Sequence, residues 1–479
     1  MRPLMLSQLA RWCEARLIYP NDRMHDDIAI AAVRTDTRTL DAAAPTPAMP
    51  TIYVALRGER FDGHDFAAEA QAKGAVALLV DHQLDLALPQ LLCGDTQAAL
   101  GEIAAGVQEG RAAKVIALTG SNGKTSVKSM LLEILRDAGR AYANPGNRNN
   151  EIGLPLAVID APEDADYAIY EMGAGKPGDI AYLTSIVRPQ IALVNNIAPA
   201  HLERMGTLLG VADTKGAIYE ALPADGVAVI NADDAFAAYF EQRAAGRKML
   251  RFGIEASAEI VARELRGHAT GSEFVLQTPD GGAAISLPLP GRHNVMNALA
   301  AAALALAAGV SLRAIRDGLE RAEPVPGRQV SHLLGNGAVL IDDSYNANPG
   351  SMEAAIATLA VAGGESWLVL GDMAELGEGA ESLHAQTGDA ARNHGIARLY
   401  TVGRFSRATA RAFGSTSRHF ETKEKLADAL ISELHAGVRV LVKGSRSSAM
   451  DSVVAALLAA DSLRCEHGRE HSRGPEHAA

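Results

Sequence analysis

Short hydrophobic runs alternate with longer segments of mixed polarity over most of this chain. From residue 114 to about residue 255, mostly apolar runs of five or six residues precede segments whose apolar residues recur three or four positions apart. Continuous apolar runs are typical of strands buried on both faces of a parallel sheet, and the second spacing is helical. The pattern predicts an α/β domain with strands at 114–118, 167–172, 190–195, 226–231 and 249–253.

The pattern changes after residue 257. From 258 to 290 polar and apolar residues come closer to strict alternation, and an Asp-Gly-Gly turn lies at 280–282, so we predict an antiparallel meander attached to the same domain. Residues 294–312 then carry no charge over a length that could span a membrane. They are mostly alanine and include Asn294, Asn297 and Gly309, which favours a buried helix of a globular domain over the alternative of a membrane span.

Strand and helix alternation resumes after a segment with two prolines and a glycine, EPVPGRQ (323–329), which has the composition of a domain linker. The later strands are predicted at 338–342, 367–371, 397–403 and 438–444, giving a second doubly wound α/β domain. The last residues, from 465 on, lack apolar periodicity and contain three histidines, so we expect a solvated, disordered tail, with adventitious metal binding as the alternative.

The first 112 residues mix short strands and helices. A Pro/Ala-rich stretch at 41–50 predicts a loop, because proline continues neither a helix nor a central strand. The first helix is expected to be amphipathic rather than a signal peptide, because Arg11, Glu14 and Arg16 interrupt its apolar residues. The predicted domains are therefore 1–112, 113–322 and 323–462, with a tail at 463–479.

Composition agrees with a globular chain of about three domains, since 479 residues contain 48% hydrophobic and 21% charged residues. The net charge of −12 argues against nucleic-acid or anionic-membrane binding through the overall field, although a local basic patch stays possible. Cys13, Cys93 and Cys465 are scattered and form no disulfide framework or metal knuckle. We expect a reducing compartment, the cytoplasm.

The strongest local signal is the segment Thr-Gly-Ser-Asn-Gly-Lys-Thr-Ser at 119–126, between a predicted strand and a predicted helix. Small residues let backbone N–H groups approach phosphate oxygens, and the helix N-terminus adds positive potential. Lys124 would neutralise the β- and γ-phosphates of a nucleotide and the Thr125 hydroxyl would bind Mg²⁺. The loop is shorter than the usual G-x-x-x-x-G-K-[ST], since Leu118 stands six positions before Lys124. The alternative is a plain strand-to-helix turn.

Two further polar residues follow predicted strands of the same sheet. Glu171 ends the strand at 167–172 and His201 follows the strand at 190–195. Ligands of open α/β sheets gather at the carboxyl ends of the strands, and a carboxylate suits Mg²⁺. A surface carboxylate and a structural histidine are the alternatives.

Taken together, these segments resemble the Mur ligase family over nearly the whole chain, up to about residue 462. The first-domain motifs are TDTRTL (35–40) and ALRGERFDGHDF (55–66). The central motifs are ALTGSNGKTSVK (117–128), GNRNNEIGLPLAV (146–158), YEMGAG (170–175), IAPAHLERMG (197–206), DTKGAIYEAL (213–222) and GRHNVMNALAAAALA (291–305). The last domain contributes PVPGRQ (324–329), IDDSYNANPGSM (341–352), LGDMAELG (370–377) and VKGSRSSAMD (442–451). The short phosphate loop is the form that this family uses.

The resemblance implies a three-domain α/β enzyme. A small mixed α/β N-terminal domain would bind a UDP-sugar, a central P-loop-type parallel-sheet domain would bind ATP, and a C-terminal Rossmann-like domain would bring the incoming amine. The implied reaction is ATP-dependent amide formation through an acyl phosphate. The motifs are most similar to members that add D-alanyl-D-alanine to UDP-N-acetylmuramoyl-tripeptide in peptidoglycan synthesis, which serves cell shape and cell division. The resemblance also implies a cytoplasmic monomer.

The resemblance assigns roles to individual residues. The ATP-binding residues would be Gly120, Ser121, Asn122, Gly123, Lys124, Thr125, Ser126, Asn294, Asn297, Arg328 and Asp343. The magnesium ligands would be Thr125, Glu171, His201 and Lys215, the last as a carbamate, and Lys124, His201 and Lys215 would be catalytic. The UDP-sugar peptide would meet Thr35, Asp36, Arg38, Asn147, Asn149 and Asn150, and the dipeptide would meet Asn346, Asn348 and Arg446.

Other functions stay open on the sequence. One is a related ligase, either one that adds a diamino acid to the UDP-muramoyl dipeptide or a folylpolyglutamate synthase. Another is a P-loop ATPase without ligase activity, and a third is a catalytically inactive scaffold. The segment at 41–56 is also longer and richer in alanine and proline than the family's usual connection, which would affect the geometry of the sugar domain.

Overall fold

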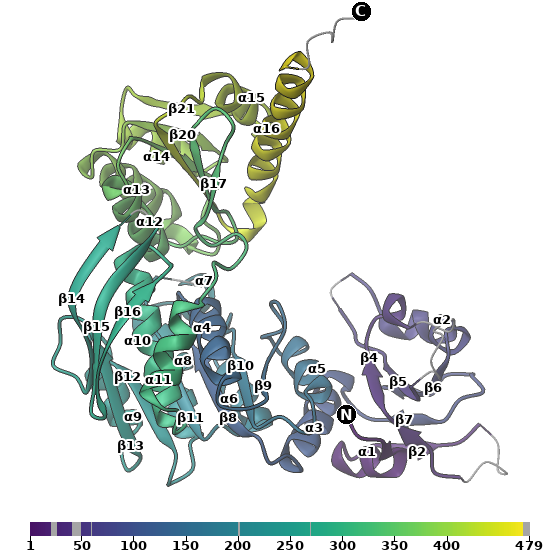
Figure 1. The fold of residues 1–479 in the computed structure, drawn as a ribbon. Helices are drawn as coiled ribbons and strands as arrows, with labels where there is room; N and C mark the ends of the chain where they lie inside the picture. Colours follow the sequence, from purple (N-terminus) through teal and green to yellow (C-terminus); the bar gives the residue numbers. More distant parts are fainter. Residues whose placement is uncertain (21–25, 41–48, 59, 200–201, 269, 473–479) are drawn as a thin grey trace, which may run out of the picture.

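The computed structural model describes residues 1–20, 26–40, 49–58, 60–199, 202–268 and 270–472, with side chains described up to Leu463. The chain forms three α/β domains. The C-terminal domain stands on one end of the central domain, and the N-terminal domain lies beside its other end (Figure 1). This confirms the predicted fold class.

The N-terminal domain is built on a five-stranded sheet in the order β2-β7-β6-β5-β4, parallel except for β2. Its strands are β2 (Arg16–Ile18), β4 (Ala32–Arg34), β5 (Thr51–Val54), β6 (Ala75–Val80) and β7 (Gln90–Leu92), and β1 (Leu4–Met5) pairs with β3 (Ala29–Ile30). The helices are α1 (Leu6–Trp12) and α2 (Ala67–Ala72), with 3-10 turns η1 (Thr37–Thr39) and η2 (Gly63–Phe66).

The central domain contains a nine-stranded sheet in the order β16-β15-β14-β13-β12-β11-β8-β10-β9. The parallel strands are β8 (Lys114–Thr119), β9 (Ala141–Ala143), β10 (Tyr167–Glu171), β11 (Ile191–Val194), β12 (Val227–Asn231) and β13 (Lys248–Gly253). The predicted meander is β14 (Ile260–His268), β15 (Gly271–Thr278) and β16 (Gly281–Leu287), whose strands pair with one another antiparallel. Strand β8 lies between β10 and β11, so the chain reverses its winding direction at the end of β8.

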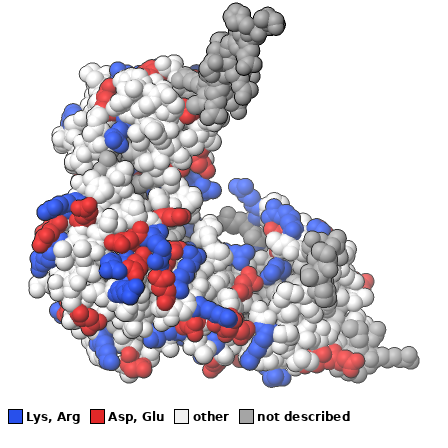
Figure 2. Space-filling view, in the orientation of Figure 1, with Lys and Arg blue, Asp and Glu red and all other residues white. Residues whose placement is uncertain are grey.

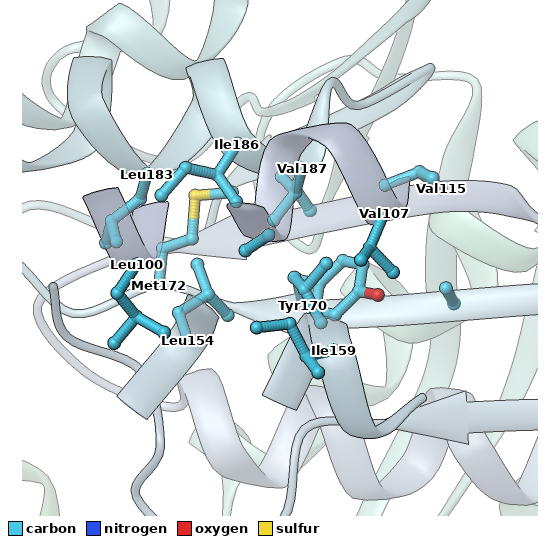
Figure 3. Close-up of a cluster of buried hydrophobic side chains, with 14 of the residues drawn as sticks. Leu100, Val107, Val115, Leu154, Ile159, Tyr170, Met172, Leu183, Ile186 and Val187 are labelled. Atoms are coloured by element: carbon cyan, nitrogen blue, oxygen red, sulfur yellow. The ribbon is translucent and has the colours of Figure 1, made fainter. Parts of the chain in front are cut away.

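Helices cover both faces of this sheet. One face packs against α4 (Lys124–Arg136), α10 (Arg292–Ala307) and α11 (Leu312–Glu320). The other packs against α3 (Thr96–Glu109), α5 (Gly153–Asp160), α6 (Asp179–Val187), α8 (Leu208–Glu220) and α9 (Ala237–Arg243), and α7 (Leu202–Met205) precedes α8. Figure 3 shows the second layer, where Leu100 and Val107 of α3 lie with Tyr170 of β10 and Leu183 of α6. Helix α3, which falls in the predicted first domain, thus packs on the central domain.

The C-terminal domain has a six-stranded sheet in the order β17-β18-β22-β19-β20-β21, parallel except for β17. Its strands are β17 (Val330–Leu333), β18 (Val339–Asp343), β19 (Glu365–Leu370), β20 (Arg398–Val402), β21 (Ser417–Phe420) and β22 (Val438–Lys443). The helices are α12 (Pro349–Val361), α13 (Ala380–Asn393), α14 (Ser406–Phe413), α15 (Lys423–Glu433) and α16 (Asp451–Ser472), with 3-10 turns η3 (Gly377–Gly379) and η4 (Arg446–Ser448).

Several details differ from the sequence predictions. The tail was predicted to be disordered from residue 463, but helix α16 continues to Ser472 (Figure 1). The uncharged segment at 294–312 is mostly α10, whose alanines are buried in the central domain. Among the described residues, no helix combines the length and the apolar character that crossing a membrane requires. Most of the Pro/Ala-rich stretch at 41–50 lies outside the described residues. Acidic and basic side chains are interspersed on the face shown in Figure 2.

Candidate active site

A cavity of about 420 Å³ lies between the central and C-terminal domains. It opens at the carboxyl ends of β8, β11 and β12, beside the position where the winding direction reverses, which is where open α/β sheets bind ligands. Nine of the predicted ATP-binding residues line it: Ser121, Asn122, Gly123, Lys124, Ser126, Asn294, Asn297, Arg328 and Asp343.

The phosphate loop connects β8 to α4, as the sequence predicted. Gly123 stands at the N-cap of α4 with φ +77°, and a Cβ there would lie 2.3 Å from Asn297 Oδ1. Only glycine satisfies both the left-handed backbone and the close approach of α10. Lys124 Nζ donates to the Gly120 carbonyl at 2.7 Å. Burial, reinforced by the charge of Arg328, lowers the pKa of Lys124.

Glu171 ends β10 beside this loop and is 2% exposed. Its carboxylate accepts hydrogen bonds from Thr125 Oγ1 and Asn149 Nδ2, both at 3.0 Å, and pairs with Lys128 Nζ at 3.1 Å. Burial alone would raise the pKa of Glu171, but the charges of Lys128, Lys124 and Arg328 hold it below its ordinary value. The carboxylate is therefore ionised and lies against the Thr125 hydroxyl.

Lys128 is a site residue that the sequence analysis did not single out. It is buried, and besides pairing with Glu171 it donates to the carbonyls of Asn144 and Gly146 at 2.9 and 3.2 Å. Its position four residues after Lys124 puts both lysines on one face of α4, which was the available signal. Asn144 completes the arrangement by accepting from the Glu171 backbone N–H at 2.8 Å.

Lys215 lies in α8 and is 1% exposed. Burial, joined by the positive charge of Lys124, lowers the pKa of Lys215 to about 7. The charge of Asp179 opposes these effects without cancelling them, and among the described residues no carboxylate lies within ion-pair distance of the Lys215 ammonium group. The amine therefore reaches its neutral, nucleophilic form near physiological pH.

The predicted adenine end of the cavity is formed by the first turns of α10. Asn294 Nδ2 donates to the Pro290 carbonyl at 2.8 Å, and Asn297 Oδ1 accepts from Asn195 Nδ2 at 3.1 Å. His293, next to them, also lines the cavity, and burial with the nearby charge of Lys443 lowers its pKa to about 4. This histidine is therefore neutral, so it adds no positive charge to this wall.

The C-terminal wall carries charged groups from two strand ends and the linker. Asp343 ends β18 and pairs with Lys443, at the end of β22, at 2.8 Å. Burial raises the pKa of Asp343 against the opposing effect of Lys443. Arg328 lies over the ring of Tyr345, with its Cζ 4.6 Å from the ring centroid. Neither Lys443 nor Tyr345 was predicted from the sequence as a site residue, although both stand in the motifs at 442–451 and 341–352.

Of the residues predicted to meet the dipeptide, Asn346 and Asn348 line the cavity and Arg446 lies next to it. Asn348 Oδ1 caps α12 by accepting from the Ser351 N–H at 2.9 Å, and Asn348 Nδ2 donates to Asn122 Oδ1 of the phosphate loop at 2.8 Å. Arg446 is exposed and its Cζ lies 5.6 Å from the centroid of the Tyr345 ring. A role in dipeptide binding stays a prediction for all three.

The residues predicted to bind the sugar nucleotide do not line this cavity. In the N-terminal domain, Asp36 caps η1 and pairs with Arg38 at 2.6 Å, beside Thr35. Asn147 and Asn150 are exposed on the loop that brings Asn149 to Glu171. His201 lies outside the described residues, so its predicted metal and catalytic roles have no structural counterpart here.

Comparisons with known proteins agree with this geometry. Three family models match the chain: the Mur ligase family catalytic domain at 51–119, the Mur ligase middle domain at 118–305 and the Mur ligase glutamate ligase domain at 328–446. The UDP-N-acetylmuramoyl-tripeptide–D-alanyl-D-alanine ligase of Escherichia coli K12 is 48% identical over 435 residues, covering 90% of this chain and 94% of the relative. This chain belongs to the Mur ligase family.

Solved structures of similar proteins support the family membership. MurF from Acinetobacter baumannii superposes with a TM-score of 0.89 at 33% identity, covering 96% of this chain and 99% of that one. MurF ligase from Thermotoga maritima in complex with ADP gives a TM-score of 0.80 at 26% identity, covering 90% and 98%. The similarity extends over all three domains of this Mur ligase.

Proposed function

We propose that this protein is an ATP-dependent ligase that joins D-alanyl-D-alanine to UDP-N-acetylmuramoyl-tripeptide. The observation that carries the proposal is the single cavity in which the phosphate loop of the central domain faces Arg328, Asp343 and Asn346 of the C-terminal side. The similarity to D-alanyl-D-alanine ligases of this family over 90% of the chain supports the substrates.

The chemistry requires two anions to meet. The carboxylate of the tripeptide attacks the γ-phosphate of ATP, the bond from the γ-phosphorus to the bridging oxygen breaks, and an acyl phosphate and ADP form. The neutral amine of the dipeptide then attacks the acyl carbon, the bond from that carbon to the phosphate oxygen breaks, and inorganic phosphate and a proton leave. Lys124 and Arg328 supply positive charge where the γ-phosphate would lie, and the ordered loop fixes its position.

The residues beside the phosphate loop suit Mg²⁺. The Thr125 hydroxyl and the ionised Glu171 carboxylate lie 3.0 Å apart, and both are hard oxygen ligands of the kind that Mg²⁺ prefers. Bound Mg²⁺ would neutralise charge on the phosphate oxygens. Thr125 and Glu171 are our proposed ligands, with His201 as a further one.

Lys215 would contribute as a carbamate. Its neutral amine can attack CO₂ to give a carbamate and a proton, which converts a cation into an oxygen ligand for the metal site. The lowered pKa of about 7 supports this, because only the unprotonated amine reacts. An unmodified, protonated Lys215 would place a second positive charge near Lys124, which the charge of Asp179 offsets only in part.

The remaining assignments follow the family resemblance. Thr35, Asp36 and Arg38 would meet the uridine diphosphate, Asn147, Asn149 and Asn150 would line the peptide, and Asn346, Asn348 and Arg446 would meet the dipeptide. Arginine suits the dipeptide carboxylate because it donates two parallel hydrogen bonds. We also propose that the protein acts as a monomer in the cytoplasm, where its cosubstrate ATP is available.

The test is phosphate release from ATP in the presence of UDP-N-acetylmuramoyl-tripeptide, with and without D-alanyl-D-alanine, together with mass analysis of the product. We expect release to require both substrates and to yield the pentapeptide. Lys124→Ala should abolish release, while its circular dichroism spectrum stays that of the wild type. Lys114→Ala is a matched control, because Lys114 starts β8, the strand that leads into the phosphate loop, and donates to the Ala308 carbonyl, away from the cavity.

Other outcomes would point elsewhere. Phosphate release that does not depend on the dipeptide would support an ATPase without ligase activity. Activity only with a UDP-muramoyl dipeptide or a folate would keep the family and change the substrate. Wild-type turnover by Lys124→Ala would refute the phosphate-loop assignment.

A further inference from the structure

Two arginines lie close to the Tyr345 ring, Arg328 in the cavity lining and Arg446 next to the cavity. Arg328 Cζ is 4.6 Å and Arg446 Cζ is 5.6 Å from its centroid. The backbone of Tyr345 is tied to the linker, since the Tyr345 N–H donates to the Gly327 carbonyl at 3.1 Å. A Cβ on Gly327 would lie 3.1 Å from Tyr345 Cβ, so the linker packs closely against the base of the Tyr345 side chain.

Arg328 differs from most arginines of this chain in how it is held. Within the described part of the chain, its guanidinium makes no ion pair and no side-chain hydrogen bond, and the Tyr345 ring is the contact that orients it. A carboxylate partner would neutralise its charge and occupy its N–H donors. A ring attracts the cation through its π face and leaves the donors in the guanidinium plane free.

The charge of Arg328 reaches the reacting end of the cavity. Arg328 lines the same cavity as Lys124 of the phosphate loop and Asp343 of the C-terminal wall, so its guanidinium faces the position that the nucleotide phosphates would occupy. A cation with unused donors at this position fits an anionic ligand with several oxygens, such as a polyphosphate.

We propose that Tyr345 is a positioning residue that orients Arg328 toward the phosphates of the nucleotide. In this arrangement the charge of Arg328 is not neutralised and its N–H donors stay available. This inference deepens the proposed function and rests on it. The hydroxyl of Tyr345 is not needed for the role, whereas the π face is. Tyr345 acts through Arg328, so its effect should vanish when Arg328 is removed.

A double-mutant cycle tests the inference. Tyr345→Leu should lower kcat for ligation by roughly tenfold, whereas Tyr345→Phe should stay within about twofold of the wild type, because a phenyl ring retains the π face. In an Arg328→Ala background, Tyr345→Leu should change kcat by less than about twofold. Phe420→Leu is a matched control: Arg418 lies 5.0 Å from that ring, in β21 and outside the cavity lining, and kcat should not change.

Three results would overturn the proposal. An equal loss from Tyr345→Leu in both backgrounds would show that the ring acts on the nucleotide or the fold directly. A loss in Tyr345→Phe as large as in Tyr345→Leu would make the hydroxyl the functional group, and an unchanged Tyr345→Leu would remove any role. If Tyr345→Leu does not fold, Tyr345→Met takes its place in the cycle, since methionine fills space without a π face.

Measuring the affinity for ATP by calorimetry distinguishes a failure of this inference from a failure of the proposed ligase function. If the wild type binds ATP but does not ligate, the proposed ligation fails. The same cycle on ATP affinity then decides the role of Tyr345: coupling between Tyr345 and Arg328 supports it, and additive effects refute it.

Discussion

Lys215 shows most clearly how the environment of one residue sets its chemistry. A solvated lysine is protonated at neutral pH, and on the sequence alone a lysine in a helix would be expected at the surface. Here α8 buries it, and the nearby charge of Lys124 adds to the cost of protonation, so the pKa falls to about 7. Below pH 7 the amine is mainly protonated and unreactive toward CO₂, and above pH 7 it is mainly neutral.

The carbamate proposal therefore predicts a pH-dependent modification. With ¹³C-labelled bicarbonate, the wild type should show a carbamate carbon resonance at pH 8 that weakens at pH 6, and Lys215→Ala should lack it. Lys215→Ala should also lose ligation, and added acetate should restore part of it by supplying an oxygen ligand. Lys73→Ala is a suitable control, because Lys73 lies in the N-terminal domain and pairs with Glu69. Full activity of Lys215→Ala without added acid would contradict the proposal.

At the scale of elements, the junction of the phosphate loop with α4 depends on how closely α10 approaches. Gly123→Ala would add a Cβ 2.3 Å from Asn297 Oδ1 in a backbone with φ +77°. We expect it to destabilise the protein by about 2–3 kcal/mol in urea unfolding and to abolish ATP binding, since both strain and a clash arise.

Gly309→Ala separates these two causes. Gly309, just past the other end of α10, has φ +87°, and a Cβ added there would meet no atom within 4 Å. Gly309→Ala should lower the free energy of unfolding by roughly 1 kcal/mol, the cost of the left-handed backbone alone, and should leave ATP binding intact. Equal effects of the two substitutions would mean that the contact with Asn297 is unimportant.

The elements with a strong hydrophobic signal were predictable from the sequence. The predicted strands at 114–118, 167–172 and 226–231 match β8, β10 and β12 to within one residue at each end. Strands β17 and β21 were missed because each is only four residues long and contains polar, partly exposed residues. Both lie at the edges of their sheet. Hydrophobic runs report burial on both faces, which edge strands lack.

The same distinction applies to the site. The phosphate loop was predictable because its residues are contiguous and its chemistry is local. The pairing of Asp343 with Lys443, or of Tyr345 with Arg328, depends on strands and loops brought together by the fold, and nothing in their local sequence reveals the partner. The family resemblance supplied the positions of Asp343 and Arg328 but not these contacts.

At the scale of the whole molecule, the C-terminal domain contacts the phosphate loop directly. Asn348 Nδ2 donates to Asn122 Oδ1 at 2.8 Å, and a Cβ on Gly350 would lie 3.1 Å from Ala198 Cβ. The Glu203 N–H also donates to the Glu375 carbonyl at 3.4 Å. The first of these contacts connects the nucleotide loop to the cap of α12.

We predict that this contact biases the arrangement of the domains. Asn348→Ser keeps an N-cap oxygen for α12 but is too short to reach Asn122, so it removes a hydrogen bond worth about 1 kcal/mol without uncapping the helix. Small-angle scattering without nucleotide should then give a larger radius of gyration, and Asn122→Ala should give the same change. An unchanged radius in both variants would show that the remaining contacts set the arrangement alone.

The ion pair of Lys128 with Glu171 has a consequence for the protein under metal scarcity. Without a bound divalent ion, a buried carboxylate that had no other cationic partner would be costly to keep ionised. Lys128 supplies that partner from within the same domain. On the proposed assignment of Thr125 and Glu171 to Mg²⁺, chelation should therefore stop the reaction and leave the free energy of unfolding almost unchanged, so that the enzyme would lose and regain magnesium without refolding.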